Sequence, residues 1–594
     1  MTRAKILSAS AGSGKTYQLA YKYVHDVISD PASYRNILAV TFTNKATEEM
    51  KTRILREINK LAAGEESGYM GALCRDLNLD GQTVRERAKA ARTNILHDYS
   101  RFTVLTIDTF FQRILRAFII ELGIELDYTV ELDPTTILEK SADALVEGIR
   151  DNRELQQWLV DFMHERMDES KRWDIREGIL DLGSELFAEQ NKEQIRNARS
   201  KEELRKIVNA TTGRAMASQR HIVELANKAI GLIEGAGLSA GDFKKHTASF
   251  FYAAAGTPTK EPTKTARNCS EPAESAWLAK ERKSPAAQAL LGELSAIMSE
   301  ICRMYDRSVK TWNTAELLRE NYRSFALLSD LYGKVVEMCE QENLMLLSET
   351  KYILSKFIAD NDAPFIYEKV GTRFDRFMID EFQDTSRKEW ENFLPLLRNA
   401  MAQTNDTSVL IVGDVKQSIY RWRGGDWKIL QETAPAALGN ETAVVSLQDN
   451  YRSLPVIVEF NNDAIGKVVG CDNDMLNTQL DEACGNGKIS SALRDELHDT
   501  LAKAYAGHRQ NPKRGASGTG YVDITLYDEE PPVIERIKSV LDKGFSPKDI
   551  MILTRSKSDG KKIAGVLLDF MHDNTDPRYK FDIMTQEALV ISSS

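Results

Sequence analysis

Short apolar runs, each followed by a segment with helical periodicity, mark the beginning of the chain. The runs occupy residues 5–7, 37–41 and 104–107. After each run, apolar side chains recur every three or four residues, the spacing that places them on one face of a helix. A strand followed by a helix, repeated along the chain, is typical of a parallel β-sheet whose functional loops lie at the carboxyl ends of the strands. We therefore predict such a sheet.

The pattern changes between residues 121 and 345, where strand signals nearly vanish and helical patterns rich in Glu, Lys and Arg take over. This change predicts a large helical insertion whose charged side chains form a solvated face rather than a nucleic-acid surface. Within the insertion, residues 253–284 carry Pro258, Pro262 and Pro272. A stretch with several prolines favours an exposed loop.

Strand patterns resume after the insertion. They occupy residues 377–379, 409–412, 443–446, 521–526 and 550–553. Residues 509–520 contain Pro512 and several glycines. This composition predicts a flexible surface loop, and a linker is favoured over a nucleic-acid-binding tail.

The overall composition is that of an ordinary globular protein. The 594 residues, 42% hydrophobic and 28% charged, predict about four domains or subdomains. No apolar run approaches the roughly 20 residues of a membrane helix, and the N-terminus lacks a signal-peptide pattern, so we expect a cytoplasmic protein without membrane contact. The six cysteines form no C-x-x-C pair, which favours reduced thiols. Because the formal net charge is −10, any nucleic-acid site has to be a local groove.

The clearest candidate site follows the first apolar run. Residues 9–16 read ASAGSGKT and stand directly before a helical pattern. A glycine-rich turn between a strand and a helix directs several backbone N–H groups at one point, where the helix N-terminus already favours an anion. In such a loop Lys15 reaches the β- and γ-phosphates of ATP, and Thr16 holds Mg²⁺. Four further residues form the cradle for the phosphates: Ala11, Gly12, Ser13 and Gly14.

A pair of acids follows the predicted strand at residues 377–379. Two adjacent carboxylates at the end of a buried strand are costly unless they serve a cation or a proton transfer. Asp380 suits Mg²⁺, and Glu381 can orient and deprotonate the attacking water. After the next strand, Gln417 is a candidate sensor of the γ-phosphate.

Two loops combine aromatic side chains with polar or cationic neighbours. In the first, Phe42 precedes Thr43 and Asn44 at a predicted helix start, where the ring can stack a base and the polar groups can hold a phosphate. A capped turn with a core phenylalanine explains the same residues, and spacing alone favours that interpretation. In the second loop, aromatic and cationic side chains alternate, an arrangement suited to single-stranded nucleic acid. These side chains are Tyr420, Arg421, Trp422 and Arg423.

Taken in order, these motifs resemble the UvrD/Rep-type superfamily 1 DNA helicases, and within them the RecB/AddA-like subunits of helicase–nuclease complexes. Six stretches are similar to successive motifs of that family: residues 9–16, 40–50, 106–111, 380–384, 413–424 and 450–453. Lys416, where UvrD itself has an acidic residue, and the long insertion favour the RecB/AddA-like branch.

The resemblance implies an α/β fold, with a RecA-like P-loop NTPase motor domain that carries a large helical insertion and is followed by part of a second RecA-like domain. It assigns residues 1–120 and 346–440 to the first motor domain. Residues 121–345 form the helical insertion, and residues 441–594 form a partial, apparently truncated second motor domain.

The resemblance also implies roles for single residues. Arg452 is implied as the arginine finger of ATP hydrolysis, and Tyr451 as the residue that stacks on adenine. Closing and opening on ATP would move single-stranded DNA, in the 3′ to 5′ direction of the family, along four side chains: Phe42, Thr109, Tyr420 and Trp422.

The chain departs from the family pattern at several positions. The glutamine-bearing segment ahead of the first strand has no room here, and Tyr17 stands where UvrD-like members carry an adenine-contacting Arg, so nucleotide selectivity is open. Asp108 stands where many relatives have His, which alters an expected DNA contact. The later motifs and an acid-acid-lysine nuclease cluster are not found before Ser594. We therefore expect the N-terminal part of a longer protein, without a nuclease site.

Three functions remain to be separated. The first is an ATP-dependent DNA translocase or helicase in DNA repair or recombination, which acts on single-stranded DNA or duplex ends with a nuclease or helicase partner subunit. The second is a DNA-binding ATPase fragment without unwinding activity of its own. The third is a P-loop small-molecule phosphotransferase, whose ATP turnover would not respond to DNA.

Overall fold

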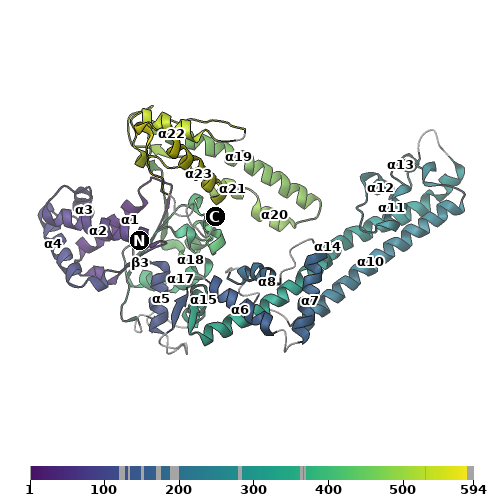
Figure 1. The fold of residues 1–594 in the computed structure, drawn as a ribbon, viewed down its shortest axis with the longest axis horizontal. Helices are drawn as coiled ribbons and strands as arrows, with labels where there is room; N and C mark the ends of the chain where they lie inside the picture. Colours follow the sequence, from purple (N-terminus) through teal and green to yellow (C-terminus); the bar gives the residue numbers. More distant parts are fainter. Residues whose placement is uncertain are drawn as a thin grey trace. The chain divides into compact units, whose positions relative to one another are not determined.

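The structure is a computed structural model in which two compact units are distinguished (Figure 1). It describes residues 2–118, 128–131, 134–148, 153–168, 175–187, 191, 195, 200–278, 284–360, 365–366, 370–528 and 530–584. The first unit comprises Met1–Ser453 and Asn461–Arg514, and the second comprises Leu454–Phe460 and Gly515–Ser594. Among the described residues, no helix is long and apolar enough to cross a membrane.

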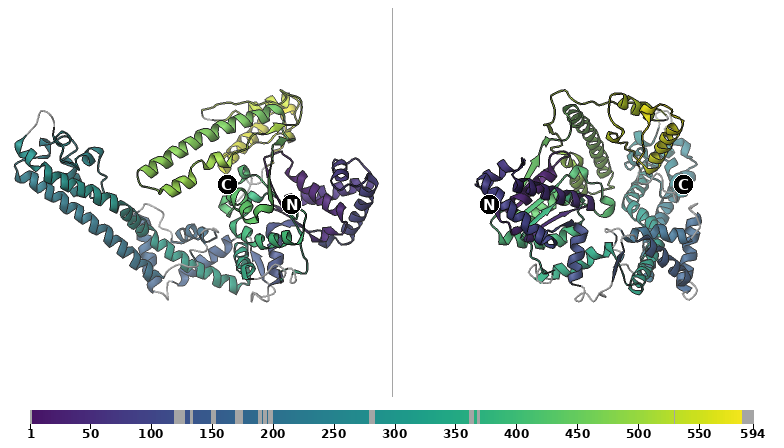
Figure 2. Two further views of the ribbon diagram at one scale, coloured as in Figure 1. Left: turned by 180° about the vertical axis from the view of Figure 1, so that it is seen from behind. Right: turned by 60° about the vertical axis from the view of Figure 1, so that its left-hand side comes forward.

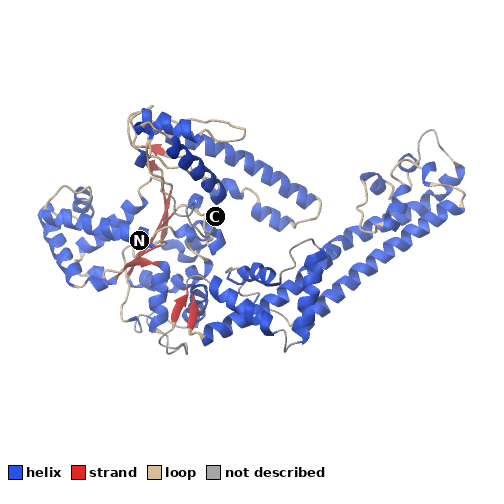
Figure 3. Cartoon of the chain, viewed as in Figure 1, coloured by secondary structure: helices blue, strands red, loops and turns tan. Residues whose placement is uncertain are grey.

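A six-stranded parallel sheet forms the centre of the first unit, with strand order β3-β2-β6-β7-β1-β8 (Figure 3). The strands are β1 (Ala4–Ala9), β2 (Ile37–Thr41), β3 (Val104–Thr106), β6 (Arg376–Ile379), β7 (Val409–Gly413) and β8 (Thr442–Leu447). Each corresponds to one of the first six apolar runs of the sequence. The predicted parallel sheet is therefore confirmed.

Alternate residues of the strands enter two separate hydrophobic cores. In β1, Ile6 joins one core and Leu7 the other, and in β7, Ile411 and Val412 divide in the same way. Side chains of successive strand residues point to opposite faces of a sheet, so both faces are covered. This double burial explains why the central strands read as continuous apolar runs rather than as alternating patterns.

Helices cover both faces of the sheet. The first core includes residues of α5 (Ile107–Ala117), α15 (Leu347–Asp360) and α17 (Arg387–Gln403). The second includes residues of α1 (Lys15–Ser29), α2 (Asn44–Ala63) and α4 (Gly81–His97). Short helix caps fix where helices begin: Thr43 Oγ1 accepts from the Ala46 amide at 3.1 Å, and Thr106 Oγ1 from the Thr109 amide at 3.2 Å. The functional loops therefore lie at the carboxyl edge of the sheet.

The described residues between β3 and β6 are largely helical. They form α6 (Thr135–Glu147), α7 (Arg153–Asp168), α8 (Ile175–Gly183), α10 (Lys201–Gly235) and α14 (Pro285–Gln341). The long helices α10 and α14 run side by side (Figure 1, Figure 2). A short parallel pair, β4 (Thr129–Glu131) with β5 (Leu344–Leu346), joins the two ends of this segment.

The predicted exposed loop at residues 253–284 is wrong. Its described residues include the end of α11 (Ser249–Gly256), α12 (Lys264–Asn268) and α13 (Glu274–Trp277). Trp277 is fully buried, and its Nε1 donates a hydrogen bond to Ser295 Oγ of α14 at 2.9 Å. The prolines fall between these short helices, where they end one helix or precede the next without interrupting the packing.

After β8, residues up to Ser453 and Asn461–Arg514 belong to the first unit, whereas Leu454–Phe460 belongs to the second. β9 (Asp449–Asn450) pairs in parallel with β10 (Asn511–Pro512), and α19 (Pro455–Gly485), α20 (Ser491–Leu497) and α21 (Thr500–Ala504) lie between them in the sequence. The domain boundary predicted at residue 441 thus precedes β8, a strand that pairs with β1. The assignment of motor domains stays a prediction.

The second unit contains α22 (Val533–Asp542) and α23 (Lys557–Asp573). The strands predicted at residues 521–526 and 550–553 are wrong, because neither segment pairs with any strand in the described part of the chain. Leu526 is 94% exposed and Leu553 is 85% exposed. A strand needs a hydrogen-bonded neighbour, which apolar patterning alone does not supply.

Candidate functional site

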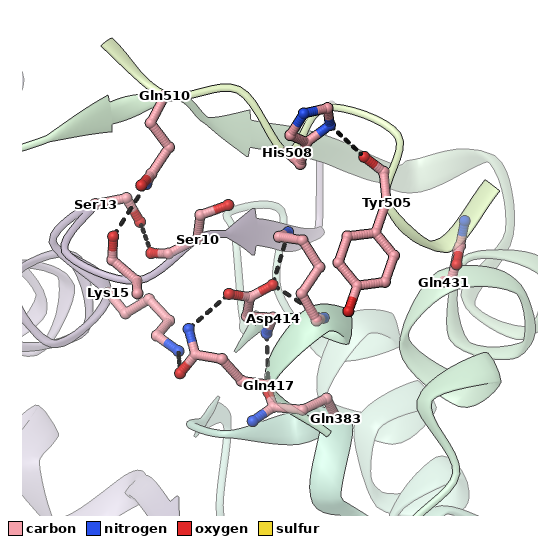
Figure 4. Close-up of polar contacts among 12 residues, drawn as sticks. Ser10, Ser13, Lys15, Gln383, Asp414, Gln417, Gln431, Tyr505, His508 and Gln510 are labelled. Atoms are coloured by element: carbon pink, nitrogen blue, oxygen red, sulfur yellow. Dashed lines mark hydrogen bonds and ion pairs between the residues drawn. The ribbon is translucent and has the colours of Figure 1, made fainter. Parts of the chain in front are cut away.

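The glycine-rich loop between β1 and α1 has the backbone of an anion site. Gly12 and Gly14 adopt φ values of 77° and 86°, in the left-handed region that favours glycine. Ser13 donates both its amide and its hydroxyl to the Ser10 carbonyl, at 3.2 and 2.7 Å (Figure 4). Gly14 is the N-cap of α1 and provides no side-chain cap. The first amides of α1 thus have no side-chain cap, as an anion site at a helix N-terminus requires. The phosphate cradle at residues 11–16 stays a prediction.

Three predicted catalytic side chains meet beside this loop. Lys15 Nζ lies 3.2 Å from Glu381 Oε2, which follows β6. It also lies 3.4 Å from Gln417 Oε1, which follows β7 (Figure 4). The residues are far apart in the sequence, and the parallel sheet brings them together because its strands end at one edge. The arrangement unites a cation, a carboxylate and an amide at the start of α1.

Gln383, to which the sequence assigned no role, links the acid motif to the loop after β7. Its Nε2 donates to Glu381 Oε2 at 2.8 Å, and its Oε1 accepts from the Asp414 amide at 2.8 Å. Asp414 in turn accepts from Gln417 Nε2 at 2.6 Å and pairs with Lys416 Nζ at 2.7 Å. The position of Glu381 is therefore fixed by the same loop that carries Gln417.

The acid motif holds two buried carboxyl groups. Burial, followed by the charge of Glu381, raises the pKa of Asp380 to about 7 and that of Asp384 to about 6. Asp384 Oδ1 is buried without a hydrogen-bond partner in the described part of the chain. A buried carboxylate oxygen that lacks a hydrogen-bond partner, such as Asp384 Oδ1, fits a site that receives a cation. Thr16 carries a hydroxyl oxygen in the first turn of α1. That Thr16 and Asp380 together hold Mg²⁺ stays a prediction.

The segment with Tyr451 and Arg452 lies directly on the phosphate loop. The Tyr451 amide donates to the Gly12 carbonyl at 2.9 Å, and Asn450 Nδ2 donates to the Ala11 carbonyl at 3.2 Å. Asn450 Oδ1 also accepts from the Arg452 amide at 2.9 Å. Both Tyr451 and Arg452 are exposed, so their side chains are accessible at the loop.

The close approach of this segment explains why position 12 is glycine. A Cβ on Gly12 would lie 2.8 Å from Asn450 Oδ1 and 2.9 Å from Arg452 Cβ. A side chain would also add the strain of positive φ, about 1–2 kcal/mol.

We predict that Gly12→Ala weakens ATP binding about tenfold, because the alanine can keep the native shape of the loop only by accepting both the backbone strain and the clash. Equilibrium binding of ATP measures the effect. Gly231→Ala is the matched control, since a Cβ on Gly231 in α10 meets nothing within 4 Å. Equal affinities of the two variants would contradict the prediction.

The predicted DNA-binding aromatics Phe42 and Tyr420 form a small platform. Their ring centroids are 4.7 Å apart, and the Arg423 guanidinium lies over the Phe42 ring at 5.0 Å. Phe42 is half-buried and belongs to neither core of the sheet. Of the alternative interpretation, the capped turn is confirmed by the Thr43 cap, while the core position of the phenylalanine is wrong. Thr43 and Asn44 are exposed beside it. The side chain of Trp422, in η8 (Arg421–Arg423), lies outside the described residues.

Arg423 is held by an ion-pair chain. Its Nη2 lies 2.9 Å from Asp108 Oδ2, and Asp108 also lies 3.5 Å from Lys351 Nζ. Lys351 pairs in turn with Glu389 at 2.6 Å. Thr109, the neighbour of Asp108, is engaged with the Thr106 hydroxyl at 2.8 Å. The departure from His at position 108 therefore gives Arg423 an acidic partner.

Several participants have no distinctive signal in the sequence. Gln383 and Asn450 lie inside the motifs, close in sequence to Glu381 and Tyr451. This closeness was the sequence signal that could have indicated a role for them in the site. Lys351 and Glu389 belong to ordinary helical patterns, and residues 509–520 read as a linker.

The strand order, the phosphate loop and the acid pair after β6 define the core of a P-loop NTPase. Residues 2–437 match the model of the UvrD/REP helicase N-terminal domain, and the chain belongs to this family. The resemblance inferred from the motifs is thus confirmed.

Relatives carry the names of enzyme subunits. The chain is 24% identical over 612 residues to the exonuclease/helicase subunit RexA of Lactococcus lactis subsp. cremoris (strain MG1363), covering 95% of this chain and 47% of the relative. RexA of Streptococcus pneumoniae serotype 4 (strain ATCC BAA-334 / TIGR4) is also 24% identical, with 95% and 46% covered. The RecBCD enzyme subunit RecB of Chlamydia pneumoniae is 32% identical over 120 residues, 20% of this chain and 11% of the relative. The chain spans about half the length of the RexA relatives that it matches.

Proposed function

We propose that the chain is part of an ATP-driven DNA translocase or helicase that acts in DNA repair or recombination. The observation that carries the proposal is the loop after β7. Gln417 of this loop contacts Lys15 of the phosphate loop, and Tyr420, three residues further on, contacts Phe42 of the platform. A change at the nucleotide would therefore reach the DNA platform through one short segment.

The chemistry of ATP hydrolysis is assigned to residues at the carboxyl edge of the sheet. The phosphate loop binds the phosphates, and Lys15 neutralises their charge. Glu381, fixed by Gln383, orients the attacking water and accepts its proton. Thr16 and Asp380 would hold Mg²⁺, which supplies positive charge to the phosphate oxygens. Arg452 stabilises the charge of the transition state, and Tyr451 stacks on adenine.

The DNA site is assigned to the platform of Phe42 and Tyr420 with Thr43, Asn44 and Thr109 beside it. Aromatic rings accept successive bases whatever the sequence, while Arg423 is placed for a phosphate. We assign Trp422 to the same site from its place in the motif. By analogy with the family, movement is 3′ to 5′.

The names of the relatives support a partner protein, since each describes one subunit of an enzyme. We propose that this chain acts on single-stranded DNA or duplex ends in the cytoplasm together with a nuclease or helicase partner. Residues 1–120 and 346–440 would form the first motor domain, and residues 441–594 part of the second.

A DNA-binding ATPase that does not unwind is the second candidate. The second unit favours it, because its apolar residues line a cavity of about 430 Å³ and its segments 521–526 and 550–553 pair with no strand among the described residues. Strand separation of a tailed duplex, compared with ATP hydrolysis in the same reaction, distinguishes the two. Hydrolysis that responds to DNA without strand separation would favour this second candidate.

Removing one ring of the platform tests the DNA site. We expect Phe42→Ala or Tyr420→Ala to weaken binding of an oligothymidylate about tenfold, because stacking on one base is worth about 1–3 kcal/mol. Fluorescence anisotropy measures the affinity. Tyr252→Ala is the matched control, because Tyr252 is exposed on α11, an element of the predicted insertion. Unchanged affinity in both platform variants would remove the proposed DNA site.

A substitution of Asp108 is expected to change DNA affinity in the opposite direction to the platform variants. Its carboxylate competes with DNA phosphate for Arg423, so Asp108→Asn should strengthen oligothymidylate binding. The slope of the logarithm of affinity against the logarithm of salt concentration should also steepen by up to about 0.7, since one more cation meets a phosphate. Asp306→Asn, which breaks the 2.8 Å pair with Arg267, should change neither quantity. Weaker binding by Asp108→Asn would show that the ion pair supports the DNA site instead.

A further inference from the structure

A glutamine beyond the recognised motifs reaches back to the phosphate loop. Gln510 Nε2 donates to the Ala11 carbonyl at 3.0 Å, and Gln510 Oε1 accepts from Asn450 Nδ2 at 2.9 Å. Figure 4 shows the Gln510 side chain directed toward the phosphate loop. Asn450 Nδ2 also donates to the same Ala11 carbonyl at 3.2 Å. One backbone oxygen of the phosphate loop thus receives two side-chain amides, which are hydrogen-bonded to each other.

Hydrogen bonds hold the backbone of Gln510 as well as its side chain. Asn462 accepts from the Gln510 amide and donates to the Gln510 carbonyl, both at 2.9 Å. The following residue, Asn511, donates its amide to the Gln448 carbonyl at 2.8 Å, and the Lys513 amide donates to the Asn450 carbonyl at 2.8 Å. Gln510 therefore has little freedom to leave the Ala11 carbonyl.

These contacts fix one peptide group of the phosphate loop. The Ala11 carbonyl and the Gly12 amide belong to the same planar trans peptide, so the amide points opposite to the oxygen. Holding the oxygen on the side of Gln510 and Asn450 directs the Gly12 amide to the other side. The same hydrogen bonds hold Asn450, which accepts from the amide of Arg452.

We propose that Gln510 is a positioning residue of the nucleotide site. It preorganises the peptide between Ala11 and Gly12 and keeps the segment with Arg452 against the phosphate loop. The inference rests on the proposed function in so far as the ligand of the loop is ATP, and it adds a participant from the segment that the sequence presents as a linker. We call the hydrogen bonds of Gln510 and Asn450 to the Ala11 carbonyl the clamp. Asn462, which holds the Gln510 backbone, lies at the start of Asn461–Arg514, the second part of the first unit.

Three substitutions of Gln510 test the clamp at increasing similarity to the native side chain. Gln510→Leu removes both hydrogen bonds. Gln510→Glu keeps an acceptor for Asn450 but turns a carboxylate oxygen toward the Ala11 carbonyl. Gln510→Asn keeps the amide but is one methylene too short to reach. We expect each to raise the KM for ATP and the dissociation constant of mant-ADP about fivefold, as the loss of one well-placed hydrogen bond does, with the largest effect for Gln510→Glu.

Gln431→Leu is the matched control. Gln431 also donates its side-chain amide to a backbone carbonyl, that of Lys503 at 3.0 Å, and it does not contact the phosphate loop. A merely structural role of Gln510 would lower the fraction of active molecules and leave KM and the dissociation constant unchanged. The dissociation constant is independent of that fraction, so partial unfolding does not imitate the expected result, and Gln510→Asn covers the case in which Gln510→Leu does not fold.

A coupled pair gives a second readout. If Asn450 and Gln510 act on one carbonyl, Asn450→Ala combined with Gln510→Leu should raise the dissociation constant by less than the product of the single effects. Native nucleotide affinity in all three Gln510 variants would overturn the inference. Absence of ATP hydrolysis by the unsubstituted chain would instead count against the proposed function, while mant-ADP binding would still test the clamp.

Discussion

Lys15→Ala is expected to reduce ATP turnover at least about 100-fold, the loss typical of removing one preorganised charge-stabilising group from an active site. Lys15 Nζ lies within 3.4 Å of both Glu381 and Gln417, and its side chain is only 11% exposed. Among the ion pairs of the described residues, Lys15 is the cation that pairs with Glu381. A steady-state assay of phosphate release from ATP, with Mg²⁺ and DNA present, measures the effect.

Lys206→Ala serves as the control for this variant. Lys206 forms an exposed pair with Glu202 on α10 at 2.8 Å, so its loss should leave turnover unchanged. Thermal unfolding of both variants checks that they are folded. Turnover of folded Lys15→Ala near the level of the control would contradict the assignment of the phosphate loop.

Asp380→Asn is expected to abolish Mg²⁺-dependent turnover and, without Mg²⁺, to stabilise the protein above pH 7. Burial and the charge of Glu381 raise the pKa of Asp380 to about 7, whereas an unfolded aspartate titrates near pH 3.9. Between these values the folded chain binds more protons than the unfolded chain, so the contribution of Asp380 to stability falls as the pH rises through 7. Asparagine does not titrate, so the variant escapes this loss.

Thermal unfolding at pH 5 and pH 8 measures the difference. We expect the Tm of Asp380→Asn to exceed that of the unsubstituted chain by about 2–4 °C at pH 8 and by a smaller margin at pH 5, where only part of the contribution of Asp380 has been lost. Added Mg²⁺ should raise the Tm of the unsubstituted chain but not that of the variant. A variant less stable at pH 8, or an equal response to Mg²⁺, would contradict the cation site.

Asp26→Asn, in helix α1, is a control of opposite sign. Burial alone raises the pKa of Asp26, but the hydrogen bond with His25 and the charges of Lys22 and Arg376 outweigh burial and lower it. A depressed pKa contributes stability above the pKa of the unfolded residue, and this stability is lost as the pH falls through the folded value. Asp26→Asn should therefore destabilise the protein at pH 8, where Asp380→Asn stabilises it.

The sheet and the phosphate loop were predictable because their signals are local. Each central strand is a continuous apolar run, and the glycines, Lys15 and Thr16 stand within eight consecutive residues. The anion site of this segment follows from its own backbone conformation, a glycine-rich turn that leads into a helix. The acid pair was predictable for a similar reason, since two carboxylates after a buried strand call for a cation.

The rest of the site depends on contacts between distant residues. Gln383 finds the Asp414 amide 31 positions away, and Gln510 finds the Ala11 carbonyl 499 positions away. No periodicity encodes such pairs. The same limit explains the errors in the fold. Within 253–284, Trp277 packs against a distant partner, Ser295 of α14. Residues 521–526 and 550–553 have the pattern of a strand but no partner among the described residues.

The loop after β7 is the feature on which the proposed function depends, because it contacts the phosphate loop through Gln417 and the DNA platform through Tyr420. The most direct test is the rate of ATP hydrolysis by the unsubstituted chain as oligothymidylate is added. We predict a saturable rise in the rate, with half-saturation at the oligothymidylate concentration that half-saturates binding. A rate that stays the same while the DNA is demonstrably bound would contradict the proposed coupling.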